Sequence, residues 1–164
     1  MQPLPKTIES KTRVQYQDCD PFNHLNNAKY IDYAMAARTE QLLDHYGFNT
    51  AELAYQQGIG WVAAQTQISY FYPASWLEVL TIETRLLHFS ASSLLMEAIV
   101  WDEQKSHTKS VLWVKLVHFD IKNQNSRKHS EAFMNLFSDI HHPISGNPTF
   151  EDRAASFKRS NAAM

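Results

Sequence analysis

A short polar segment near the start of the chain, residues 17–26, gathers side chains that can support hydrolytic chemistry. An aspartate has an ordinary pKa of about 4, so Asp20 is ionised at neutral pH and can act as a nucleophile or as a general base. His24 can transfer a proton, and the amide of Asn27 can orient water or a carbonyl group. These types also have a plainer use, because Asp18, His24 and Asn27 can simply hydrogen-bond a loop or cap a helix.

Other chemistries that an Asp-Cys-Asp sequence could suggest are not supported. A calcium loop that starts at Asp18 needs a Glu at its twelfth position, where this chain has Lys29. The chain has only 4 glycines, which form neither a phosphate-binding loop nor a Gly-x-Ser-x-Gly nucleophile elbow. His141 and His142 are adjacent, so their rings point differently, and no third ligand follows at a useful spacing. We therefore expect no metal site.

A long helix is predicted directly after this polar segment. Asn26 and Asn27 can cap its start, and Gly47 is a plausible C-terminal stop. Between them apolar residues recur at helical spacing, namely Ala28, Ile31, Ala34, Met35, Leu42 and Tyr46. The many alanines keep the helix slim, so a sheet can approach it closely.

The rest of the chain is dominated by alternating, β-branched and aromatic segments, which are typical of strands. Five strands are expected, over residues 8–16, 61–72, 77–89, 93–103 and 110–121. The connections between the last four are too short for a parallel crossover, so these strands should be antiparallel. Ser130 can cap a short helix that ends near Ile140. We expect one domain over residues 1–140 and a poorly ordered tail over 141–164, which lacks apolar periodicity.

One long helix and one antiparallel sheet make an α+β protein, and wrapping the sheet around the helix buries both apolar faces. The five strands also leave exposed edges, which natural proteins often cover by association. We therefore expect a homodimer or a homotetramer.

The polar segment and the helix together resemble the acyl-CoA thioesterases of the 4-hydroxybenzoyl-CoA thioesterase type, which have the hot-dog fold. The matching features are the Asp18-x-Asp20 pair, His24, the pair Asn26-Asn27, a helix that opens with Tyr30, and Ala37-Arg38. A weaker likeness continues through residues 67–74 and 92–94, so that it covers about residues 8 to 130. The family commonly has Gly where this chain has Asn23, although Asn tolerates a positive φ.

This resemblance implies hydrolysis of an acyl-CoA substrate to a free acid and CoA, with no cofactor. The second acid of the pair is catalytic in the family, which assigns Asp20, and Asn27 and His24 are the accompanying candidates. A backbone N–H at a helix N-terminus would meet the oxyanion, but the sequence does not place it. A basic turn of Lys122, Arg127 and Lys128 could bind the phosphates of CoA, or be only a solvated turn.

The composition excludes several other classes of protein. The formal charge is −2, which gives no general attraction to nucleic acid. No apolar run approaches the length of a membrane span, and the start of the chain does not resemble a secretory signal. Cys19 is the only cysteine, so no internal disulfide can form, and we expect a cytoplasmic protein.

Two alternatives to a thioesterase remain. One is a hot-dog enoyl-CoA hydratase or dehydratase, whose signature resembles Asp-x-Asn-Pro-x-His. Here Pro21 follows Asp20 directly and His24 is four residues from it, so the spacing differs. The other alternative is a non-catalytic module that binds acyl-CoA and regulates another process.

Overall fold

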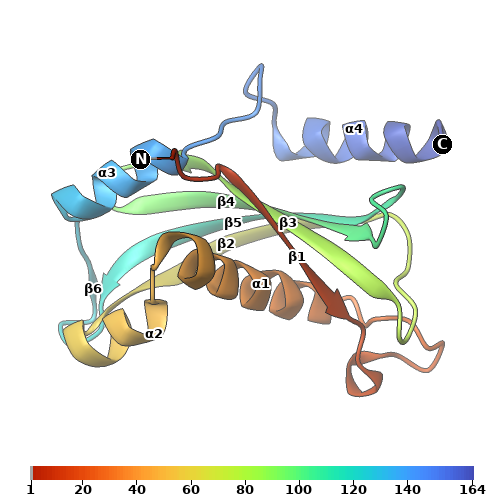
Figure 1. Cartoon of the computed structure of the whole chain (residues 1–164), viewed down its shortest axis with the longest axis horizontal. Coiled ribbons are helices and arrows are strands. Elements are labelled where there is room, and N and C mark those ends of the chain that lie inside the picture. Colours follow the sequence, from red (N-terminus) through yellow and green to blue (C-terminus); the bar gives the residue numbers. More distant parts are fainter. Residues whose placement is uncertain (1) are drawn as a thin grey trace.

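A curled antiparallel sheet is the frame of the computed structural model, which describes residues 2–164 (Figure 1). Its strand order is β1-β3-β4-β5-β2, and the short β6 pairs with the end of β5. The strands are β1 Thr7–Arg13, β2 Ile59–Tyr70, β3 Val79–Phe89, β4 Ser93–Asp102, β5 Thr108–Asp120 and β6 Asn125–Ser126. The five long strands confirm the predicted hot-dog architecture, with most boundaries within three residues of the prediction.

The long helix α1, Lys29–Tyr46, packs against one face of the sheet. Tyr30, Ala34 and Ala37 contribute its buried surface, and the sheet contributes alternate residues of β3, β4 and β5. The alanines permit this close approach, as the sequence predicts. Gly47 ends the helix with φ of 64°, which confirms the expected C-terminal stop.

Short helices close the end of the fold where α1 ends. The turn α2, Thr50–Glu52, continues into the π-helical turn η2, Leu53–Gln57, and neither was expected from the sequence. The helix α3, Glu131–Ile140, begins at Ser130, whose hydroxyl accepts the N–H of Phe133 at 3.2 Å, as expected.

The predicted poorly ordered tail is wrong for most of its length, because residues 150–162 form the helix α4, Phe150–Ala162. This helix lies on the opposite side of the sheet from α1 (Figure 1). Phe150 and Phe157, two turns apart, pack on Trp113 and Val111 of the outer face. Two apolar contacts in an otherwise polar helix give almost no periodic signal, so the sequence alone does not reveal it.

A buried carboxylate attaches α4 to the sheet. Glu97 of β4 has no exposed surface and accepts hydrogen bonds of 2.8–3.0 Å from Arg85, Arg153 and the indole N–H of Trp113. Burial alone would raise the pKa of Glu97, but Arg153, Trp113 and Arg85 together hold it below the ordinary value. The outer face of the sheet therefore carries a fully paired charge beneath α4.

Candidate active site

The polar segment of residues 14–28 is an ordered loop that is held to the start of β3. It begins with the 3-10 turn η1, Tyr16–Asp18, and Leu25 is buried with its N–H donated to the carbonyl of Ala74 at 2.7 Å. Asn23 has φ of 60°. Its side chain tolerates this left-handed conformation, so the loop does not need a glycine at this position. Asn23 also accepts the N–H of Trp76 at 2.9 Å.

The carboxylate of Asp20 is oriented by the loop that carries it. Its Oδ1 accepts the backbone N–H groups of Phe22 at 2.9 Å and His24 at 3.1 Å. Among residues 2–164, no group donates a hydrogen bond to Oδ2, and no cation lies within 4 Å of the carboxylate. One oxygen thus fixes the side chain, while the other is available to an incoming group.

Asp18, in contrast, has a structural role in the loop. Its Oδ2 accepts the hydroxyl of Tyr33 at 2.7 Å, and that hydroxyl accepts the N–H of Gln15 at 3.0 Å. Burial and the neighbouring Asp18 raise the pKa of Tyr33 to about 12. This chain of bonds joins the loop to α1, which agrees with the plainer interpretation of Asp18.

The side chains of His24 and Asn27 do not join Asp20 in a hydrogen-bonded group. His24 contributes its backbone N–H, and Asn27 is exposed with its carbonyl accepting the hydroxyl of Tyr70 at 2.8 Å. No hydrogen bond from either side chain is found within the described chain. Any catalytic role of these two side chains therefore requires the bound substrate.

The helix α1 starts one residue later than the asparagines suggest. Its N-cap is Ala28, which has no side-chain acceptor, whereas Asn26 accepts the N–H of Ala28 at 3.1 Å. The prediction that Asn27 caps the helix is wrong. The first-turn N–H groups of α1 consequently have no side-chain cap, and they follow the Asp20 loop directly.

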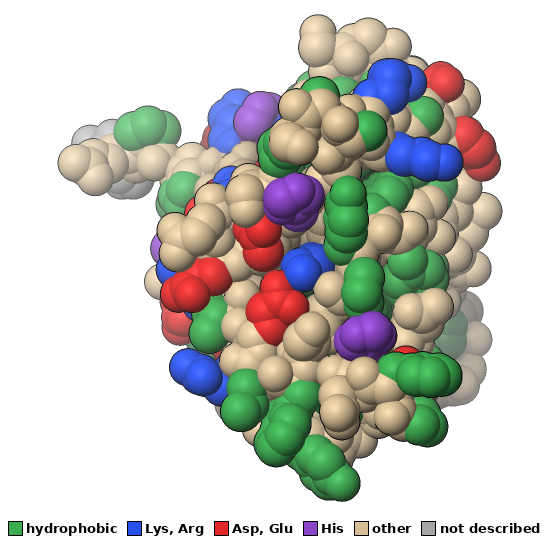
Figure 2. Space-filling model, turned by 90° about the vertical axis from the view of Figure 1, so that its right-hand side faces the viewer, with side chains coloured by type: hydrophobic (Ala, Val, Ile, Leu, Met, Phe, Trp, Pro, Cys, Tyr) green, Lys and Arg blue, Asp and Glu red, His purple; other side chains and the backbone are tan. Residues whose placement is uncertain are grey.

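Apolar side chains surround the Asp20 loop on the surface. Tyr16, Phe22 and Trp76 are 70%, 79% and 44% exposed, and the rings of Tyr16 and Trp76 meet edge to face at 5.5 Å. Figure 2 faces this end of the molecule and shows hydrophobic side chains gathered along its lower edge. Such a patch beside an oriented carboxylate is typical of a binding surface.

The predicted phosphate-binding residues lie at the other end of the molecule. Tyr70 of β2, beside Asn27, pairs with Ser110, whereas Ile59 at the start of β2 pairs with Asp120, just before the basic turn. The ten steps along β5 span about 34 Å at the usual strand rise. Figure 1 shows the red-orange loop and β6 at opposite ends. A single chain therefore does not bring Lys122, Arg127 and Lys128 to its own Asp20, and their role in binding the phosphates of CoA stays a prediction.

Sequence reasoning missed an apolar cavity of about 360 Å³ between α1, the sheet and α3. Its lining includes Leu42, Leu94, Trp61 and Phe137, and Arg38 is the only charged residue among those that line it. The signal in the sequence is Arg38 itself, four residues after the buried Ala34 and so on the core side of the helix.

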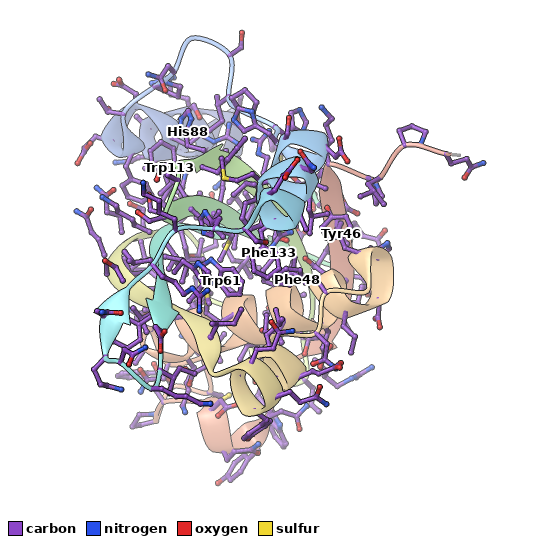
Figure 3. All side chains as sticks on the ribbon, turned by 90° about the vertical axis from the view of Figure 1, so that its left-hand side faces the viewer. Tyr46, Phe48, Trp61, His88, Trp113 and Phe133 are labelled. Carbon is purple, nitrogen blue, oxygen red and sulfur yellow. The ribbon has the colours of Figure 1, made fainter. Side chains whose placement is uncertain are left out.

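Two aromatic residues that line the cavity, Phe48 and Trp61, form a cluster with Phe133 of α3. Phe48, Trp61 and Phe133 lie 5.3–5.5 Å apart between ring centroids. Figure 3 shows the three rings, with Tyr46 beside them, between α1, β2 and α3.

Two buried histidines continue this aromatic stack. Trp61 stacks on His118 at 4.7 Å between centroids, and His118 stacks on His129 at 4.9 Å. Neither ring nitrogen of His118 has a hydrogen-bond partner among residues 2–164, whereas His129 binds Trp61 and Ser90. Burial lowers the pKa of both histidines, and the charge of His129 lowers that of His118 further.

These histidines predict a pH-dependent stability. Because their pKa in the folded state is below the ordinary value of 6.5, their stabilising contribution is complete above about pH 6.5 and is lost as the pH falls. Protonation of each histidine can lower the free energy of unfolding by up to about 1.4 kcal/mol for each unit by which the pH falls. Urea unfolding at several pH values should show this slope between about pH 6.5 and 5, above the range in which carboxylates protonate. His118→Phe should flatten it, and an unchanged slope would contradict the prediction.

A family model described as thioesterase-like superfamily matches residues 14–157, so the chain belongs to this superfamily. The match extends beyond residue 140 into α4. It confirms the family and the enzyme class, a thioesterase, that the residues around Asp20 predict.

Individual relatives are similar at low identity. The chain is 24% identical to the long-chain acyl-CoA thioesterase FadM of Escherichia coli K12, over 73% of this chain and 88% of that protein. It is 29% identical to the acyl-CoA thioester hydrolase YbgC of Escherichia coli O6:H1, over 51% of this chain and 60% of that protein.

A solved structure of a 1,4-dihydroxy-2-naphthoyl-CoA thioesterase from Synechocystis superposes with a TM-score of 0.73 at 13% identity, covering 84% of this chain and 99% of that one. The structure of the Staphylococcus aureus protein SAV2348, solved in complex with CoA, superposes with a TM-score of 0.74 at 15% identity. This match covers 90% of this chain and 89% of that one. These likenesses show the hot-dog fold. In the described part of this chain, no helix is both long and apolar enough to cross a bilayer.

Proposed function

We propose that this protein hydrolyses acyl-CoA thioesters to a free carboxylic acid and CoA, with Asp20 as the catalytic residue. The observation that carries the proposal is the Asp20 carboxylate, which is fixed through Oδ1 and free at Oδ2, in the loop that leads into α1, whose N-cap residue Ala28 has no side-chain acceptor. The superfamily, and the acyl-CoA substrates that the names of FadM and YbgC state, support it.

The two features can act on one thioester group. Oδ2 of Asp20 either attacks the carbonyl carbon to form an anhydride, or takes a proton from the water that attacks it. The negative charge that develops on the carbonyl oxygen is met by first-turn N–H groups of α1, where the helix dipole is also favourable. The C–S bond then breaks and CoA leaves as a thiolate. In the nucleophilic route, water next hydrolyses the anhydride and regenerates the Asp20 carboxylate. In both routes the attacking water supplies the new oxygen of the acid and the proton that the thiolate takes up.

We further propose that the active form is a homodimer paired along β2. This strand is a sheet edge, and its middle residues, including Val62 at 45% exposed, face solvent. The other edge, β1, carries Glu9, Lys11 and Arg13, which discourage edge pairing.

Within one chain the basic turn lies far from Asp20. Antiparallel pairing of two β2 strands would bring the basic turn of one subunit close to Asp20 of the other. It places the start of β2 in one chain beside the end of β2 in the other. The basic turn of the partner subunit, which includes Lys122, Arg127 and Lys128, then lies near the Asp20 loop and can meet the phosphates of CoA. Light scattering on the purified protein tests the dimer, and a monomer would contradict it. A cytoplasmic location remains a prediction.

The direct test of function is CoA release from a panel of acyl-CoA substrates, followed with a thiol reagent. We expect turnover of at least one aliphatic or aromatic acyl-CoA. In a parallel reaction with an enoyl-CoA, any loss of ultraviolet absorbance should be matched by released CoA, whereas a hydratase would remove the absorbance without releasing CoA. Saturable acyl-CoA binding without CoA release would instead identify a binding module and refute the proposal.

A further inference from the structure

We propose that the cavity between α1, the sheet and α3 is a binding site for a free aliphatic carboxylate, whose head group pairs with Arg38. This goes beyond the proposed hydrolysis at Asp20, because the residues that line the cavity include none from the Asp20 loop.

The charge of Arg38 has no counterion in the structure. Its side chain is buried, with 7% of the residue exposed, yet no carboxylate of residues 2–164 lies within 4 Å of it. An arginine keeps its charge in proteins, and a buried charge without a partner is costly. Glu97, which is also charged and buried, differs from Arg38 because two arginines neutralise its charge, as is usual for a buried charge.

The hydrogen bonds of Arg38 are also incomplete. One Nη1–H donates to the hydroxyl of Thr84 at 3.1 Å, and that hydroxyl itself donates to Gln41. A guanidinium has five N–H donors; besides the bond to Thr84, this one interacts with the side chain of Tyr46, and no carboxylate of the described residues accepts a hydrogen bond from it. On its other side, the guanidinium carbon lies 6.0 Å from the centre of the Tyr46 ring. The unused donors belong to a side chain that lines the cavity.

The cavity selects the rest of the ligand. Apart from Arg38 and two threonines, its walls are apolar or aromatic, and Leu42, Leu94 and Leu116 are typical of them. Its volume of about 360 Å³ falls in the usual range for small-molecule sites. One cationic group in an apolar chamber fits a molecule with a carboxylate head and a hydrocarbon body, and a planar guanidinium can bind that head through two hydrogen bonds.

Isothermal titration calorimetry with decanoate and its neutral analogue decanol, in the absence of CoA, tests the proposal. The native protein should bind decanoate about 10- to 100-fold more tightly than decanol, the range for hydrogen bonds to a charged group. Equal affinities, or no binding of any straight-chain acid from hexanoate to hexadecanoate, would overturn the proposal. This comparison needs no variant and so does not depend on the folding of one.

Variants locate the site. Arg38→Met, which keeps the side chain's length and removes its charge, should bind decanoate and decanol equally. Lys115→Met removes an exposed charge on the outer face and should retain the preference for decanoate. Leu94→Phe, which fills part of the cavity, should weaken both ligands. A preference that survives in Arg38→Met would overturn the proposal.

Two further arms separate this site from the proposed reaction. Asp20→Asn should bind decanoate with unchanged affinity, so loss of hydrolysis and loss of acid binding are independent results. The carboxylate could also be the far end of an acyl-CoA chain. In that case an ω-carboxyacyl-CoA should show a higher KM with Arg38→Met, while a plain acyl-CoA of the same length should not.

Discussion

Asp20→Asn should lower kcat for thioester hydrolysis by about 10²- to 10⁴-fold, the range for a lost general base, and by more if Asp20 is the nucleophile. The amide oxygen of Asn can still accept the N–H groups of Phe22 and His24, so the loop should keep its conformation. The loss would then report the missing charge at the position of Oδ2. Steady-state kinetics of CoA release measures it, and KM should change much less than kcat.

Asp18→Asn is the matched control for this experiment. It removes a carboxylate two residues away but keeps an acceptor for the Tyr33 hydroxyl, so we expect less than about a tenfold change in kcat. Circular dichroism should show both variants folded. A folded Asp20→Asn protein with native activity would exclude Asp20 as the catalyst.

The largest effect on stability is expected at Glu97. Glu97 forms an ion pair with Arg85 and another with Arg153. Glu97→Gln removes the negative charge of both pairs and leaves two guanidinium groups under α4 without a counterion. Breaking a buried ion pair in this way typically costs about 3–5 kcal/mol. For a protein of this size, the loss should lower Tm by about 6 to 20 °C.

Urea unfolding and thermal melts measure this effect, with Glu103→Gln as the control. Glu103 pairs with Lys11 at 3.4 Å on the surface, and its loss should change stability by less than about 1 kcal/mol. Similar effects of the two substitutions would show that the network under α4 does not hold the fold together.

The parts of the fold that the sequence predicts are those with a strong periodic signal. Alternation in the strands and the row of alanines in α1 reflect one buried face each, so the hot-dog architecture could be predicted. The helix α4 could not, because its attachment rests on Arg153 and Glu97, a contact between residues 56 positions apart. Charged side chains of this kind look like solvent-facing residues in a sequence.

In the candidate site, too, the sequence predicts the features that depend on local contacts and not those that depend on distant ones. The position of Asp20 follows from a local motif whose hydrogen bonds span only four residues, so the sequence is sufficient to nominate it. The separation of Asp20 from Lys122, Arg127 and Lys128 depends on the register of β2 with β5, which no local pattern encodes. The sequence draws attention to Arg38 only as part of the family-like pair Ala37-Arg38, because a lone arginine in a helix gives no sign of whether an acid lies opposite it.

The C-terminal helix restricts how copies of this protein can associate. With α4 resting on Trp113 through Phe150 and Phe157, the sheet has no bare broad surface on that side against which a second sheet could stack. Truncation before Thr149 would uncover these apolar side chains and leave Glu97 with a single arginine. Such a shortened chain should self-associate or aggregate through the uncovered face of the sheet. We therefore expect α4 to prevent non-native association.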